Sequence, residues 1–84
     1  MFYVYVVYNK KHNKFYIGQT VDIFMRLEVH NKKLFKSSYT SRFDGGWELV
    51  YKEICKNRVD ALIREKQLKS GYGRAIVKEL LRNT

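Results

Sequence analysis

The stretch Phe15–His30, FYIGQTVDIFMRLEVH, predicts a short strand, a turn and the first turns of a helix. Tyr16 and Gly18 lie at the end of the predicted strand. Arg26 and His30 are four residues apart, so they share one face of the predicted helix. A phenol, an open backbone, a guanidinium and an imidazole gathered this closely are suited to handling a phosphodiester.

The charge of the chain points to an anionic partner. Its 84 residues predict one domain with a modest core, and 17 Lys and Arg against 8 Asp and Glu give a formal net charge of +9. Such a charge is tolerated most easily beside a polyanion, so nucleic acid is the first candidate and an anionic membrane surface the second. The membrane is disfavoured because no predicted helix pairs a wide apolar face with an all-basic one. No run approaches the ~20 apolar residues of a membrane span either.

Cysteine and histidine usage argues against a disulfide framework or a zinc site. Cys55 is the only cysteine, and His12 and His30 lie far from it and from each other in the sequence. The apolar beginning Met1–Tyr8 lacks the basic leader and cleavage site of a signal peptide. We therefore expect a cytoplasmic protein in a reducing compartment.

Three strands are predicted. Phe2–Tyr8 is rich in aromatic and β-branched residues, which predicts a strand covered on both faces. The polar turn Asn9–Asn13 leads into Phe15–Gly18, so these two strands should form an antiparallel hairpin. Trp47–Ile54 predicts the third strand. Alternate residues of this last strand should share one face: Trp47, Leu49 and Tyr51.

Three helices are predicted as well. Thr20 or Asp22 can cap the first, with Ile23 and Leu27 facing the core. The second is expected from about Val59 to Ser70, ended by Gly71 in the left-handed conformation. The third should span roughly Arg74 to Arg82. Its inward residues are expected to be Ile76, Val77, Leu80 and Leu81.

The segment Lys32–Gly46 mixes basic and aromatic side chains, as a nucleic-acid contact loop requires. These side chains are Lys32, Lys33, Phe35, Lys36, Tyr39, Arg42 and Phe43. An ordinary loop whose rings tuck beneath it would explain the same composition. The helical stripe of Asp22, Arg26 and His30 also has an explanation that involves no function. It could be a solvated face with an Asp22–Arg26 ion pair that contributes little to stability.

Glu65 is the anomaly in the second predicted helix. On a helical projection at ~100° per residue, Ala61, Leu62 and Leu68 define the inward arc, and Glu65 falls inside it. A carboxylate there is costly unless it is paired or binds a cation. Lys69, one turn later, could pair with it. The alternative is that Glu65 holds one Mg²⁺ beside a phosphate, because magnesium often takes only one or two carboxylates.

These residues resemble the GIY-YIG nuclease superfamily, specifically its small stand-alone bacterial members. Tyr16-Ile17-Gly18 preserves the second signature triplet, whereas Tyr3-Val4-Tyr5 keeps only the last tyrosine of the first. The matching positions, in the family's order, are Tyr5, Tyr16, Gly18, Arg26, His30 and Glu65. The resemblance implies one α+β domain over residues 1–84, with a three-stranded antiparallel sheet flanked by three helices.

The resemblance also implies single-metal hydrolysis of phosphodiester bonds in DNA. Tyr16, with Tyr5 beside it, would take a proton from the attacking water. A reference pKa of about 10 means that nearby cations would have to favour the phenolate. Arg26 would stabilise charge on the phosphate, and Glu65 would hold one Mg²⁺ or Mn²⁺. His30 would orient Tyr16 or contact the phosphate.

Substrate contacts are expected around this centre. Gly18 would let the substrate approach the backbone closely. Gln19 stands where some DNA-repair relatives have a lysine, so one direct phosphate charge is missing. The expected contact residues are Gly18, Gln19, Lys32, Lys33, Lys36, Tyr39, Arg42 and Lys69. No separate DNA-binding domain is left over, so any specificity would come from Lys32–Gly46 or from a protein partner.

Two rival hypotheses stay open at this level. The first is a non-catalytic basic nucleic-acid-binding module on the same fold, for which the +9 charge alone would suffice. The second is a protein-interaction domain that keeps the fold as a scaffold. Binding without turnover distinguishes the first, and a lack of salt-dependent nucleic-acid binding distinguishes the second.

Overall fold

A computed structural model describes residues 1–32 and 42–82. Three strands, β1 (Phe2–Asn9), β2 (Lys14–Thr20) and β3 (Trp47–Cys55), form one antiparallel sheet in the order β2-β1-β3. The helices are α1 (Ile23–Lys32), α2 (Arg58–Lys69) and α3 (Gly71–Arg82). The predicted α+β fold is confirmed, and each predicted strand is present with slightly wider bounds.

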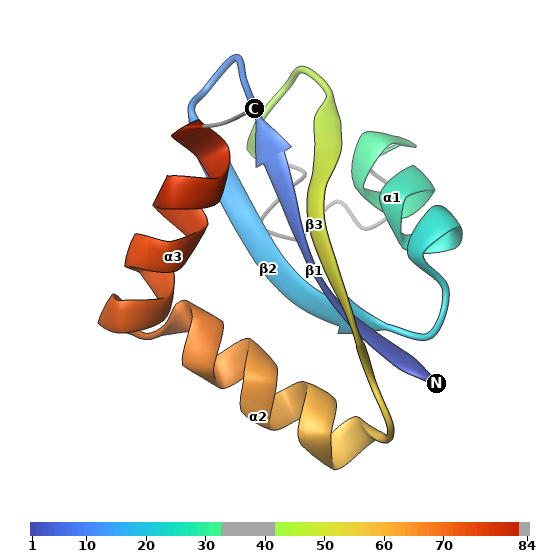
Figure 1. Cartoon of the computed structure of the whole chain (residues 1–84). Helices are drawn as coiled ribbons and strands as arrows, with labels where there is room; N and C mark the ends of the chain where they lie inside the picture. Colours follow the sequence, from blue (N-terminus) through green and yellow to red (C-terminus); the bar gives the residue numbers. More distant parts are fainter. Residues whose placement is uncertain (33–41, 83–84) are drawn as a thin grey trace.

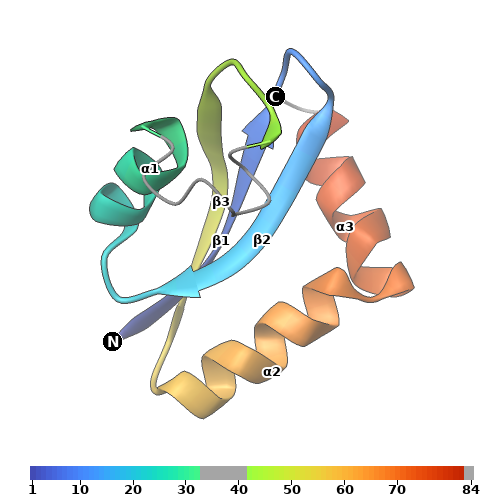
Figure 2. The same ribbon diagram turned by 180° about the vertical axis from the view of Figure 1, so that it is seen from behind.

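The sheet lies between two helical layers. Helices α2 and α3 cover one face, and α1 packs against the other (Figure 1). Figure 2 shows the same arrangement from behind. Strand β2 is one of the two edge strands of the sheet. No helix within the described ranges is long and apolar enough to cross a membrane.

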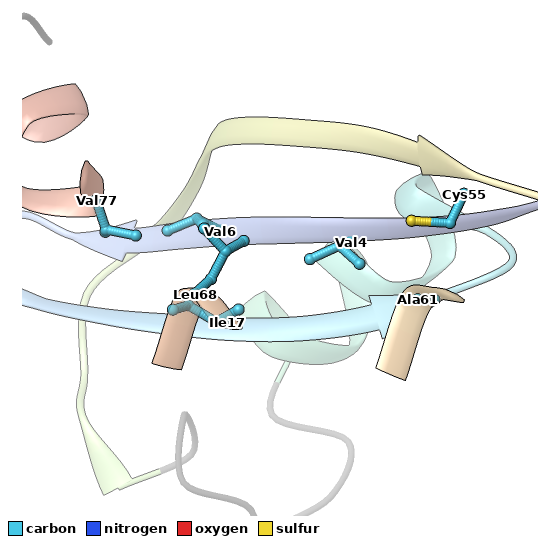
Figure 3. Close-up of a cluster of buried hydrophobic side chains, with 7 residues drawn as sticks. All are labelled: Val4, Val6, Ile17, Cys55, Ala61, Leu68 and Val77. Atoms are coloured by element: carbon cyan, nitrogen blue, oxygen red, sulfur yellow. The ribbon is translucent and has the colours of Figure 1, made fainter. Parts of the chain in front are cut away.

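The central strand β1 supplies both cores, as its composition predicts. Val4 and Val6 point toward α2 and α3, where they meet Leu68 and Val77 (Figure 3). Tyr5 and Val7 point the other way. The second cluster is completed by Trp47, with Ile23 and Leu27 of α1 packed against it. Burial on both faces therefore makes β1 the strand that joins the two layers.

Side-chain caps determine where two of the helices begin. The Asp22 carboxylate accepts a hydrogen bond from the Met25 backbone N–H at 3.0 Å, so Asp22 is the N-cap of α1. The Asn57 side chain accepts from the Asp60 backbone N–H at 2.9 Å at the start of α2. Asp22 therefore caps a helix instead of forming the surface ion pair with Arg26 that its sequence spacing also allowed; no such pair occurs within the described residues.

The expectation that Gly71 ends α2 in a left-handed conformation is wrong. Ser70 is the C-cap, with extended backbone angles (φ −70°, ψ 168°), and Gly71 already begins α3. Gly45 is the glycine with a positive φ among the described residues. Ser70 serves both helices, because its backbone N–H donates to the Gln67 carbonyl while its Oγ accepts from the Gly73 N–H.

The prediction that Tyr51 shares a face with Trp47 and Leu49 is wrong, because β3 contains a β-bulge. Trp47 and Leu49 pack on the α1 side, but Tyr51 packs on the α2–α3 side. The register shifts here: Val6 pairs with Tyr51 whereas Val7 pairs with Leu49, which leaves Val50 as the extra residue. One extra residue reverses the alternation of side chains along the rest of the strand.

Two predicted inward residues are exposed. The buried stripe of α2 consists of Ala61 and Leu68, whereas Leu62 is 44% exposed. In α3, Val77 is buried but Ile76 is 36% exposed. Each misplaced residue lies one position, ~100° of rotation, from a buried neighbour, which moves it out of a narrow contact stripe.

The close approach of α3 to α2 depends on Gly73. A Cβ at this position would lie 2.1 Å from the Gln67 carbonyl oxygen and 2.4 Å from the Leu68 Cα. We expect Gly73→Ala to lower the free energy of unfolding by about 3 kcal/mol, because the backbone would have to move apart. Urea denaturation measures this.

Gly71→Ala is the matched control, since nothing lies within 4 Å of a Cβ built there. It should change stability by less than about 1 kcal/mol, in the stabilising direction. Equal effects of the two substitutions would contradict the close helix–helix contact.

Candidate active site

A pocket of about 380 Å³ lies at the β2 edge of the sheet. The residues that line it and bear on chemistry are Tyr5, Tyr16, Gly18, Gln19, Arg26, Arg58 and Glu65. Tyr5, Tyr16 and Arg26 reach it from the α1 side, whereas Glu65 comes from α2 on the opposite face. Side chains of both layers can meet at an edge strand without crossing the sheet.

The hairpin register builds the centre of this pocket. Tyr5 on β1 pairs with Gly18 on β2, and the Tyr5 and Tyr16 ring centroids are 6.3 Å apart. A Cβ on Gly18 would lie 2.7 Å from the Tyr5 hydroxyl oxygen and 2.9 Å from Cε2 of Tyr16. Glycine is therefore required here by the two tyrosine rings. Its predicted role in admitting a substrate stays a prediction.

His30 joins this centre through Tyr5. Its Nε2 lies 2.9 Å from the Tyr5 hydroxyl oxygen, and the imidazole is only 5% exposed. The His30 and Tyr16 ring centroids are 5.2 Å apart. The hydrogen bond thus orients Tyr5, while the contact with Tyr16 is one of ring packing.

Burial keeps this pair neutral. Desolvation, aided by the positive charge of Arg26, lowers the pKa of His30 to about 4. Desolvation also raises the pKa of the Tyr5 phenol far above its ordinary value, and Tyr16 adds to that effect. At neutral pH His30 is therefore an uncharged imidazole, which cannot offer a positive charge to a phosphate.

Glu65 faces the pocket and also pairs with Lys69. Its side chain is 20% exposed, and its Oε2 lies 3.2 Å from the Lys69 ammonium nitrogen. The predicted pairing partner is thus present. Lys69 is half exposed, so its side chain can turn toward solvent and release the carboxylate.

The donor set fits a single hard cation. Within the described residues no group of three or more His, Cys, Asp or Glu side chains could hold a metal ion. Glu65 is the carboxylate that lines the pocket. A site with one carboxylate suits Mg²⁺, which keeps several water ligands and binds substrate phosphates, and does not suit zinc.

Arg58 was missed by the sequence analysis, which begins the second predicted helix at about Val59. It is the first residue of α2 and lines the pocket with Arg26. The available signal was its spacing from Glu65: residues seven apart share a helix face. Two arginines therefore line the pocket, one from each helical layer.

Several predicted contact residues are not in this pocket. Lys32 ends α1 and lies 3.8 Å from Glu28, and Arg42 is exposed; neither lines the pocket. Lys33, Lys36 and Tyr39 lie outside the described residues. Lys69 contacts Glu65 at the margin, as described above. The predicted catalytic residues are brought together, whereas neither of the described contact residues Lys32 and Arg42 lines the pocket.

Comparison with known proteins agrees with this geometry. A family model described as the GIY-YIG catalytic domain matches residues 1–79. The chain belongs to the GIY-YIG family. Membership implies nuclease activity on nucleic acid in general, and the predicted resemblance is confirmed.

This GIY-YIG domain also resembles a solved structure. A UPF0213 protein from Bacillus halodurans, determined by NMR in solution, matches with a TM-score of 0.53 and 25% sequence identity. The match covers 95% of this chain and 85% of the other. No curated protein matches the sequence.

The neutral state of His30 has a consequence for stability. Between its ordinary pKa of about 6.5 and about 4, the unfolded chain binds a proton at His30 that the folded chain does not. The free energy of unfolding should therefore fall as the pH is lowered through this window. His30→Gln, which can still hydrogen-bond Tyr5, should remove about 2 kcal/mol of that loss.

Urea denaturation of both proteins from neutral pH down to pH 4 measures the difference. Carboxylates titrate alike in the two proteins, so they cancel in the comparison. Parallel stability profiles for wild type and His30→Gln would contradict the depressed pKa.

Proposed function

We propose that this GIY-YIG domain is a metal-dependent endonuclease that hydrolyses phosphodiester bonds in DNA. The observation that supports it most is a single pocket lined by Tyr16, Gly18, Arg26 and Glu65 together. The formal net charge of +9 supports a polyanionic substrate. Specificity for a sequence or structure would come from Lys32–Gly46 or from a protein partner.

Each side chain of the pocket has a separate task in this proposal. Tyr16 acts as its phenolate, which takes the proton of the attacking water. Arg26 stabilises the negative charge that builds on the phosphate, and Arg58 is placed to assist it. Tyr5 keeps its own proton, because burial raises its pKa, so it acts as a hydrogen-bonding neighbour that His30 holds in place.

Glu65 is the residue that would hold the metal ion, Mg²⁺ or Mn²⁺. When bound, the ion would supply charge neutralisation at the leaving oxygen and would position the phosphate. Lys69 would then leave the carboxylate, and its ammonium group would be available to a substrate phosphate. The half-exposed position of Lys69 allows this exchange.

The proposal predicts divalent-dependent nicking that requires the pocket residues. Glu65→Ala should abolish cleavage because no other described residue offers the ion a carboxylate in the pocket, and Arg26→Ala should lower the rate about 10²–10³-fold. Tyr16→Phe should lower it about 10²–10⁴-fold, as expected for the loss of a general base. Labelled duplex, branched and single-stranded DNA, each incubated with Mg²⁺ or Mn²⁺, provides the assay.

Glu48→Gln is the matched control, because Glu48 is an exposed carboxylate on β3 outside the pocket. It should cleave like wild type. Cleavage that survives Glu65→Ala at an undiminished rate would rule the mechanism out.

One observation favours a second function, a nucleic-acid-binding module without catalysis. The Lys69–Glu65 ion pair satisfies the inward carboxylate without any metal. Such a module would bind DNA with no turnover in either ion, and its affinity would be indifferent to Glu65→Ala. The same set of variants therefore separates the two functions.

A further inference from the structure

A second hollow lies beside the candidate active site, between β2 and α3. It has a volume of about 500 Å³ and is lined by Phe15, Tyr16, Ile17, Lys69, Arg74 and Lys78. Figures 1 and 2 both show α3 running alongside β2. We call these six residues the β2–α3 groove.

The groove is continuous with the candidate active site. Tyr16 lines both hollows. Lys69 lines the groove, and its ion-pair partner Glu65 lines the active-site pocket. A polymer with one phosphate beside Tyr16 and Glu65 can therefore extend directly into the groove.

Among the described residues, three cations line this groove, and two of them have no acidic partner there. Arg74 and Lys78 are four residues apart on α3, which places them on one face about 5–6 Å apart at their Cβ atoms. Neither takes part in an ion pair within the described residues, whereas Arg82 of the same helix pairs with Glu79. Their positive charge is thus available to an anionic ligand.

The other half of the lining is apolar or aromatic. Phe15 and Ile17 share the face of β2 that packs against the α2–α3 core, and Tyr16 lies between them in the strand. A duplex offers such a groove only its phosphates, because its bases are stacked and paired inside. An unpaired strand offers phosphates and bare base faces together, which is the combination that cations beside aromatic rings bind.

We propose that the β2–α3 groove binds an unpaired segment of the nucleic-acid strand that leads away from the phosphate at the active site. Lys69, Arg74 and Lys78 contact its phosphates, and Phe15 packs against a base. The inference rests on the proposed function in one respect: the proposed function places the reacting phosphate next to Tyr16. Binding can be measured without cleavage, so the two can fail separately.

The test is equilibrium binding in EDTA of a short fluorescein-labelled oligothymidylate, followed by anisotropy over a range of salt concentrations. Removing two phosphate contacts from a single strand should reduce the magnitude of the slope of log K against log salt by about 1.4. Arg74→Gln/Lys78→Gln should therefore bind about 25-fold more weakly than wild type at about 0.1 M salt.

Lys52→Gln/Lys56→Gln is the matched control for lost charge. Both lysines are exposed, Lys52 on β3 and Lys56 just after it, at the edge of the sheet opposite β2. This variant should keep the wild-type slope. Thermal unfolding followed by circular dichroism checks that each variant remains folded. Equal losses of oligothymidylate affinity in the two double variants would overturn the proposal that the β2–α3 groove binds the strand.

Phe15→Leu tests whether the groove prefers an unpaired nucleic-acid strand to a duplex. The substitution keeps an apolar side chain against the core but removes the aromatic ring. It should weaken oligothymidylate binding about tenfold and leave binding of the matching duplex unchanged. Equal affinities for the single strand and the duplex, with no effect of Phe15→Leu, would overturn the assignment to an unpaired strand.

Discussion

The pairing of β1 with β2, with Tyr5 opposite Gly18, is the constraint on which the rest of the structure depends. This register directs Val4 and Val6 toward α2 and α3, and it directs Tyr5 toward α1. A slip of one residue would exchange the two faces and leave the tyrosine rings without the space that Gly18 provides. The same pairing therefore determines both the hydrophobic cores and the centre of the candidate active site.

The location of that site at the edge of the sheet explains how so small a chain assembles it. Glu65 belongs to the layer of α2, whereas Arg26 belongs to the layer of α1, and the two meet only around β2. Helix α2 is also joined to the far edge strand β3: the Nε of Arg64 lies 3.0 Å from one Glu53 carboxylate oxygen and 3.1 Å from the other.

Charge and neutrality are separated across the site. The buried Tyr5–His30 pair is uncharged at neutral pH, because desolvation favours the neutral form of each group. Positive charge lies around it, from Arg26 and Arg58 at the pocket and from the cations of the β2–α3 groove. The neutral groups are thus buried at the centre of the site, and the charged groups line the hollows around it.

Local signals in the sequence determined much of this protein: the two-sided β1 strand, the hairpin, a helix cap at Thr20 or Asp22 and the inward direction of Glu65. Periodicity and turn chemistry act over a few residues, so they can be read without knowing the fold. The tertiary structure alone decided the bulge at Val50, the attachment of His30 to Tyr5, the place of Arg58 in the pocket and the β2–α3 groove. Each of these depends on how segments distant in the sequence pack together, and no local pattern records that packing.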